Sequence, residues 1–193
     1  MWWFYMTWVP KFLHDRYSLD LMHIGLPLVT VYVMSDVGSI SGGWLSSSLI
    51  KRGVSVNGAR KTALLICALG VIPIMLAQHV SGLWAAVMIL GLATASHQGF
   101  SSNLYTLVSD MFPKRAVGSV AGLGGTCGYF GASIFQIIVG YLVGTRQNYL
   151  VPFICAGCAY IVAFGAIHLL APRLQPAIVD DSSLTLLRGD NPR

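Results

Sequence analysis

The chain has 193 residues, of which 55% are hydrophobic and only 10% are charged. Soluble domains carry about 25% charged residues, so this composition excludes an ordinary soluble fold. Disordered chains are poor in apolar residues, and that class is excluded as well. A membrane-spanning helix needs about 20 mostly apolar residues, so the composition predicts a polytopic helical membrane protein.

The first apolar segment, Met1–Leu13, is shorter than a complete span. It reads MWWFYMTWVPKFL and lacks the basic start and cleavage site of a signal peptide. As a helix it would reach about 20 Å, whereas the hydrocarbon core is about 30 Å thick. Two interpretations stay open: a short interfacial helix, whose tryptophans suit the headgroup region, or the end of a helix that begins upstream.

Long apolar runs follow, each of the length of a complete membrane-spanning helix. The five runs are Ile24–Ile50, Thr62–Val80, Trp84–Met111, Ala116–Gly144 and Leu150–Ala171. The alternating polarity of a membrane β-barrel is missing. We therefore predict an all-α membrane protein, with a transmembrane part over residues 1–171 and a polar cytoplasmic tail over residues 172–193.

Basic residues are divided unevenly between the two sets of connections. Nine of the 12 lie in residues 51–61, in residues 114–115 or after residue 172, and three lie in the opposite set. The positive-inside rule assigns the richer side to the cytoplasm. We expect a multi-pass protein of the inner (plasma) membrane with a cytoplasmic C terminus. The net charge of +5 then reflects topology, and no nucleic-acid partner is expected.

Cysteines and glycines inside the spans are predicted to pack between helices. Cys155 and Cys158 form a C-x-x-C pair, but no second pair or histidine completes a metal site. Glycines four apart, such as Gly118 and Gly122, let helix backbones approach closely, with or without a gating role. No cofactor or metal is expected. The absence of a catalytic constellation argues against an enzyme.

Asp36 is the acid deepest inside a predicted span, within a run rich in serine and glycine. Ionisable residues inside a membrane are unfavourable and point to function. We consider two roles for Asp36. It carries a coupling proton or pairs with a cation on a neighbouring span, or it forms a structural hydrogen bond with adjacent serines.

The run Thr94–Thr106 holds the densest polar cluster of any span. Helical periodicity divides it into two neighbouring stripes, one with Ser96, Phe100 and Asn103 and the other with His97, Ser101 and Tyr105. So many polar groups must face other helices or a water-filled cavity rather than lipid. The amides of Gln98 and Asn103 offer donors and acceptors that suit a hydroxyl-rich ligand.

Three stretches carry a resemblance to a known family: Trp2–Leu13, Gly43–Gly53 continuing to Asn57–Lys61, and Ser96–Asn103 followed by Ser109–Ser119. They resemble the C-terminal half of the major facilitator superfamily, in its anion:cation symporter branch, and in particular the bacterial hexuronate transporters. The resemblance implies the C-terminal six-helix bundle of a twelve-helix fold, with the first helix truncated. It also implies symport of a proton with a sugar-acid anion such as glucuronate or galacturonate.

The resemblance further implies roles for individual residues. The implied substrate-binding residues are Tyr5, Trp8, His97, Gln98, Phe100, Ser101 and Asn103, and Asp36 is the proton-coupling candidate. The implied cytoplasmic gate loop contains Lys51, Arg52, Arg60 and Lys61, with Ser47 at the position of the family's usual acid.

Such a half would expose its polar face to lipid, so we expect it to need a missing N-terminal six-helix half and not to function alone. The alternative is a non-transporting helical membrane protein or partner subunit.

Overall fold

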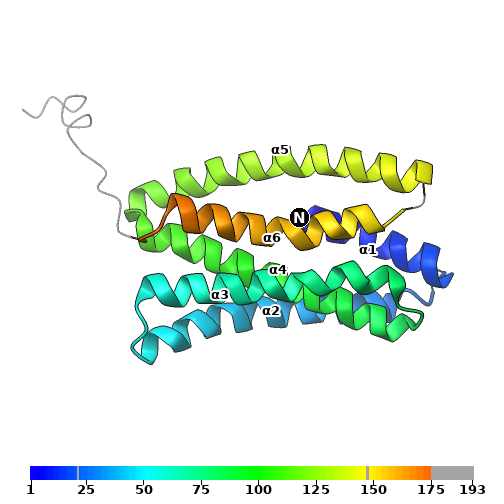
Figure 1. The fold of residues 1–193 in the computed structure, drawn as a ribbon, viewed down its shortest axis with the longest axis horizontal. Coiled ribbons are helices and arrows are strands. Elements are labelled where there is room, and N and C mark those ends of the chain that lie inside the picture. Colours follow the sequence, from blue (N-terminus) through cyan, green and yellow to red (C-terminus); the bar gives the residue numbers. More distant parts are fainter. Residues whose placement is uncertain (21, 147, 175–193) are drawn as a thin grey trace, which may run out of the picture.

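The computed structural model describes residues 1–20, 22–146 and 148–174. Its elements in chain order are α1 (Trp2–Tyr17), α2 (Gly25–Lys51), α3 (Val56–Val71), the 3-10 helix η1 (Ile72–His79), α4 (Leu83–Met111), α5 (Lys114–Arg146) and α6 (Leu150–Leu170). The helices run side by side along the longest axis of the molecule, joined by short connections at its two ends (Figure 1). The all-α prediction is confirmed for the described residues.

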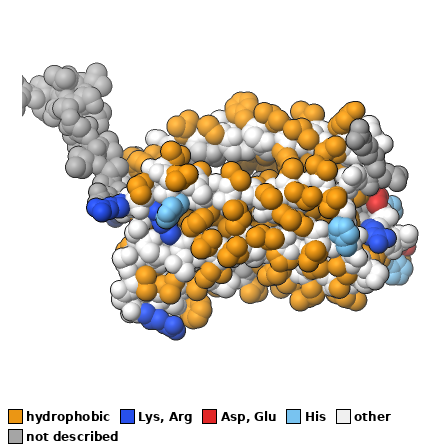
Figure 2. All heavy atoms as spheres, in the orientation of Figure 1, with side chains coloured by type: hydrophobic (Ala, Val, Ile, Leu, Met, Phe, Trp, Pro, Cys, Tyr) orange, Lys and Arg blue, Asp and Glu red, His pale blue; other side chains and the backbone are white. Residues whose placement is uncertain are grey.

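The surface matches a lipid environment. Hydrophobic side chains cover the long flank in view, and charged side chains gather at the two ends (Figure 2). Ile40 and Ile137 are each 74% exposed, an arrangement that lipid favours and water does not. Among the described residues four helical segments are long and apolar enough to cross a membrane: Val56–His79, Leu83–Met111, Lys114–Thr145 and Leu150–Leu170.

The helix α2 is long but less apolar than these four. Its 27 residues reach about 40 Å, enough to cross a bilayer. Serines, glycines and Asp36 dilute its apolar content, so it falls outside the four segments selected by hydropathy. Among the five predicted spans, α2 is therefore assigned as membrane-spanning from its length and its packing, and not from its hydropathy.

Two helix boundaries differ from those predicted. The helix α1 continues past Leu13 to Tyr17 and ends where Ser18 adopts the left-handed conformation, with φ of 53°. The helix α3 begins at Val56, six residues earlier than predicted, because the hydroxyl of Ser55 caps it by accepting from the Gly58 amide at 3.2 Å. The predicted basic loop is consequently reduced to residues 52–55.

The helices α2 and α4 run parallel and pack closely through glycine. A Cβ added at Gly42 would lie 2.5 Å from the Cα of Gly99, and one added at Gly38 would collide with the backbone of Ala95. Close approach lets polar side chains reach the opposite backbone: Thr94 Oγ1 donates to the Val31 carbonyl at 3.3 Å. Small residues thus produce here the backbone contact expected of membrane helices.

The glycine stripe of α5 does not pack in this way. A Cβ added at Gly118, Gly122, Gly124 or Gly128 would meet nothing within 4 Å, whereas one at Gly140 would lie 3.9 Å from Trp8. The prediction that this stripe packs against a neighbouring helix is therefore wrong within the described residues. The physical reason is that α5 has few neighbours within the described residues, since most of its side chains are exposed, Phe130 and Ile137 among them.

Candidate functional site

Gln136 in the second half of α5 joins this helix to the first half of α1. Its Oε1 accepts from Trp8 Nε1 at 2.5 Å, and its Nε2 donates to Thr7 Oγ1 and to the Trp3 carbonyl, each at 3.1 Å. Gln136 and Trp8 are half-buried, while Thr7 is exposed. This network, which we call the α1/α5 polar face, places Trp8 among groups that both donate and accept hydrogen bonds.

Gln136 was missing from the residues proposed on sequence grounds. A signal was available, because it is the only amide side chain in the run Ala116–Gly144. A single amide in an apolar span is unfavourable unless it finds a partner, and Gln136 finds three.

Behind this face His97 lies in a buried aromatic cluster contributed by α1, α4 and α6. The ring of Trp2 stacks on His97 at 5.8 Å, and the ring of Tyr5 lies 5.5 Å away. Nδ1 of His97 is hydrogen-bonded to Tyr160 Oη at 2.5 Å. Tyr5 is fully buried, so Tyr5 and His97 support the α1–α4 contact and do not line an open surface.

Phe100 and Asn103 are also buried between helices. The ring of Phe100 meets that of Tyr160 at 5.3 Å. Asn103 Nδ2 donates to the carbonyls of Gly42 and Gly99 at 2.8 and 2.9 Å, whereas its Oδ1 has no partner among the described residues. Asn103 therefore links α4 to α2 and keeps one acceptor unused.

Gln98 and Ser101 lie on the open side of α4. Both are half-exposed, and with the 60%-exposed Tyr105 they form one stripe with spacings of three and four residues. The polar run Thr94–Thr106 is thus divided between a buried side, which packs against other helices, and an accessible side.

Asp36 is exposed on α2, one turn after Tyr32, whose ring meets Trp2 of α1 at 6.2 Å. Residues four apart share a helix face, so Asp36 lies on the side of α2 that faces toward α1. No hydrogen bond or ion pair to Asp36 exists within the described residues. Within these residues the structure therefore contradicts two of the expectations for Asp36, the hydrogen bond with adjacent serines and the pairing with a cation on a neighbouring span, and proton coupling stays a prediction.

The residues expected to form the gate loop separate into two groups. Lys51 ends α2 and Arg52 follows it, and both are exposed. Arg60 and Lys61 lie instead in the first turns of α3 and are buried. Arg60 Nε pairs with Asp110 at the end of α4 at 2.9 Å, and its Nη1 donates to Ser46 Oγ of α2 at 2.7 Å.

Lys61 attaches α3 to the segment that follows α6. Its Nζ donates to the carbonyls of Ala171 and Pro172 at 2.8 and 2.9 Å. A lysine at a helix C terminus satisfies carbonyls that lack partners within the helix. Of the predicted tail, residues 172–174 are described, and residues 175–193 lie outside the described residues.

The arrangement suits binding and movement of a solute more than bond chemistry. Hydrogen-bonding groups of α1, α4 and α5 and the carboxylate of Asp36 are accessible, and a buried set fixes the helices behind them. Among the described residues no three His, Cys, Asp or Glu side chains come together to hold a metal ion. Cys155 and Cys158 are free thiols on the exposed side of α6, so the prediction that they pack between helices is wrong within the described residues.

Curated relatives include several sugar-acid transporters. The chain is 28% identical over 161 residues to the probable galactarate/D-glucarate transporter GarP of Escherichia coli (strain K12). These matched residues cover 83% of this chain and 36% of the relative. The chain is 30% identical over 150 residues to the hexuronate transporter of the same strain, covering 75% of this chain and 34% of the relative. The chain thus spans about a third of the length of the curated relatives it matches.

A family model described as Major Facilitator Superfamily matches residues 1–136. Together with the four apolar helices, this match makes the chain a multi-pass membrane protein, related to transporters and not to enzymes. The chain belongs to the Major Facilitator Superfamily.

Proposed function

We propose that this chain forms the C-terminal half of a transporter that moves a sugar-acid anion, such as a hexuronate, together with a proton. Support comes from relatives named as transporters of galactarate or D-glucarate, D-galactonate and hexuronate. These compounds share a carboxylate on a hydroxyl-rich carbon chain. The proposed symport couples substrate entry to protonation of a membrane carboxylate.

The observation that carries the proposal is the accessible polar face within a bundle whose flanks are otherwise apolar. Thr7 and Asp36 are exposed, and Gln98, Ser101 and Gln136 are half-exposed. Such groups are unfavourable against lipid and suit a water-filled path. We infer that a second helical half covers this face and that the substrate passes between the two halves.

Within this proposal the residues have distinct roles. Gln98 and Ser101 contact the substrate hydroxyls through accessible hydrogen-bonding groups, and Gln136 does so through the remaining lone pair of its Oε1. Trp8, whose indole N–H is donated to Gln136, contacts the substrate through its ring. Tyr5, His97, Phe100 and Asn103 hold that surface in position from behind. Asp36 accepts the coupling proton, since its carboxylate is exposed and unpaired within the described residues.

The orientation is also part of the proposal. The end that contains Lys51, Arg52 and Arg60 faces the cytoplasm, as the positive-inside rule requires. Residues 172–193 form a tail on the same side, and the membrane is the inner (plasma) membrane.

Uptake of radiolabelled D-glucuronate by cells tests the proposal. Cells express this chain with the N-terminal half of the E. coli hexuronate transporter, or either half alone. We expect uptake only with both halves, inhibited by unlabelled galactarate or D-galactonate and abolished by a protonophore. Gln136→Ala should reduce uptake, whereas Thr126→Val, a polar-to-apolar change elsewhere on α5, should not.

Uptake that resists the protonophore would contradict proton symport. A complete absence of uptake, with both halves present in the membrane and folded, would contradict transport of these anions and favour a non-transporting partner subunit.

A further inference from the structure

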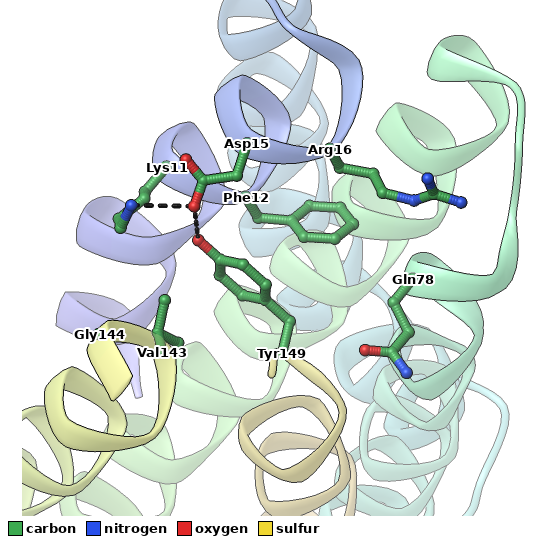
Figure 3. A pocket seen from close by; sticks show the side chains of 8 residues that line it. All are labelled: Lys11, Phe12, Asp15, Arg16, Gln78, Val143, Gly144 and Tyr149. Atoms are coloured by element: carbon green, nitrogen blue, oxygen red, sulfur yellow. Dashed lines mark hydrogen bonds and ion pairs between the residues drawn. The ribbon is translucent and has the colours of Figure 1, made fainter. Parts of the chain in front are cut away.

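A cavity of about 460 Å³ lies at the end of the bundle opposite the Arg60–Asp110 pair, between α1, η1, α5 and α6 (Figure 3). We call it the α1/α6 vestibule. It is separate from the α1/α5 polar face, since Thr7, Trp8 and Gln136 are not among its lining residues. The lining is Lys11, Phe12, Asp15 and Arg16 of α1, Gln78 of η1, Val143 and Gly144 of α5, and Tyr149 before α6. Pockets for small molecules typically measure about 300–1,000 Å³, so its volume suits a single small ligand.

One carboxylate of the vestibule is already paired. Asp15 Oδ2 accepts from Lys11 Nζ at 2.9 Å and from Tyr149 Oη at 2.6 Å. Burial alone would raise the pKa of Asp15, but these two hydrogen bonds lower it below its ordinary value, so Asp15 is ionised at neutral pH. Burial and the Asp15 carboxylate raise the pKa of Tyr149, which therefore stays protonated and donates.

Arg16 contributes a second positive charge to the vestibule. The charge of Lys11 is matched by that of Asp15. Arg16 is exposed and has no ion pair within the described residues. In Figure 3 its side chain extends from α1 toward the side of the opening on which Gln78 of η1 lies.

The lining therefore offers a ligand two kinds of polar contact. A guanidinium presents a fork of N–H donors that matches a carboxylate. The amide of Gln78 both donates and accepts, as the hydroxyls of a polyol require. Phe12 and Val143 close the cavity from behind, but both side chains are buried, so the accessible contacts are polar.

We propose that the α1/α6 vestibule binds a sugar-acid monoanion, with its carboxylate on Arg16 and its hydroxyls on Gln78. The ligand class rests on the proposed function. The vestibule opens on the side opposite the basic cytoplasmic end, so it serves as a first binding site where the anion collects before it reaches the α1/α5 polar face.

Arginine footprinting tests this site directly. The 193-residue chain in nanodiscs of phosphatidylcholine is treated with phenylglyoxal, and modification of each arginine is followed by mass spectrometry. D-Glucuronate at about ten times its Kd should slow modification of Arg16 by about tenfold. Arg52 and Arg173, exposed at the opposite end, serve as internal controls and should react at unchanged rates.

Two further additions identify the chemistry. D-Glucose, which lacks the carboxylate, should give no protection. Sodium chloride at matched ionic strength should give none either. Equal protection of Arg16 by chloride would mean screening by an adventitious ion only. Equal protection of all three arginines would mean non-specific association. Either result would overturn the proposal that the vestibule binds the sugar acid.

A transport measurement separates failure of the vestibule from failure of the proposed function. In the transporter with both halves, Arg16→Gln should raise the D-glucuronate concentration for half-maximal uptake several-fold and leave the maximal rate unchanged. Arg16→Lys should recover part of the loss, and Arg173→Gln should have no effect. Wild-type uptake kinetics in Arg16→Gln would overturn the proposal that the vestibule binds the anion and would leave the proposed function intact. Protection of Arg16 without any uptake would support the vestibule and contradict transport.

Discussion

Arg60 Nε lies 2.9 Å from the Asp110 carboxylate, and this ion pair joins the first turns of α3 to the last turn of α4. The Arg60 side chain is only 10% exposed, and that of Asp110 is 33% exposed. A further hydrogen bond from Arg60 reaches Ser46 of α2. Three helices are therefore held together at the end that we assign to the cytoplasm.

Removing the Arg60 charge should destabilise the bundle. Arg60→Gln leaves Asp110 without its partner, and we expect a loss of roughly 1–2 kcal/mol, between the values for exposed and buried pairs. Thermal unfolding in mild detergent, followed by tryptophan fluorescence, measures the loss. Arg52→Gln makes the same charge change at an exposed position and should be nearly neutral. Equal losses in both variants would mean that net charge, and not the ion pair, is responsible.

The contact between α2 and α4 should be intolerant of a single added methyl group. Gly42→Ala would place a Cβ 2.5 Å from the Cα of Gly99. Backbone cannot move aside as a flexible side chain can, so we expect a cost of about 1–3 kcal/mol. The neighbouring Gly43 has nothing within 4 Å of its added Cβ, and Gly43→Ala should unfold at the wild-type temperature. A comparable loss in Gly43→Ala would show that helix propensity or insertion, and not packing, explains the effect.

Helix number and order were predictable because the length of each apolar run is a local property of the sequence. The location of helix contacts was not. Both α2 and α5 are rich in glycine, yet added Cβ atoms at Gly38 and Gly42 collide with α4 while those at Gly118 and Gly122 meet open space. Which small-residue face finds a neighbour depends on the tertiary arrangement.

The candidate site was predictable only in part for the same reason. The polar run Thr94–Thr106 was recognisable, but its division into buried and accessible sides depends on partners far away in the chain. Tyr160, which is hydrogen-bonded to His97, is 63 residues away from it in the sequence. Trp8 and Gln136, which are also hydrogen-bonded, are 128 residues apart in the sequence. No spacing rule connects such positions. The helix α3 starts earlier than the apolar run predicts, because Ser55, which caps it, precedes that run.

Asp36 should determine the pH dependence of transport. Asp36→Asn removes the titratable carboxylate with little change in size. In a transporter with both halves, we expect uptake to lose its dependence on pH, with a smaller change in the affinity for the sugar acid. Initial uptake rates from acidic to neutral pH measure the effect. Ser39→Ala, three residues along the same helix, should keep the wild-type profile. An unchanged profile in Asp36→Asn would assign proton coupling to another group.

Asp15 should contribute to stability in a defined pH range. Its pKa is lowered from the ordinary value of 3.8, so the folded state favours the ionised form. The contribution is therefore fully present above pH 3.8 and is lost as the pH falls through the lower, folded value. We expect Asp15→Asn to unfold at a lower temperature than the wild type near neutral pH, with a difference that shrinks under more acidic conditions. Tyr149→Phe removes one of the hydrogen bonds to Asp15, which should raise the folded-state pKa of Asp15 toward 3.8. The contribution of Asp15 at neutral pH should then be smaller, and its loss should be complete at a higher pH than in the wild type. Melting temperatures measured across a pH series test both expectations. If the difference in melting temperature between wild type and Asp15→Asn stays the same in acid, the Asp15 side chain contributes through its shape and not through its charge.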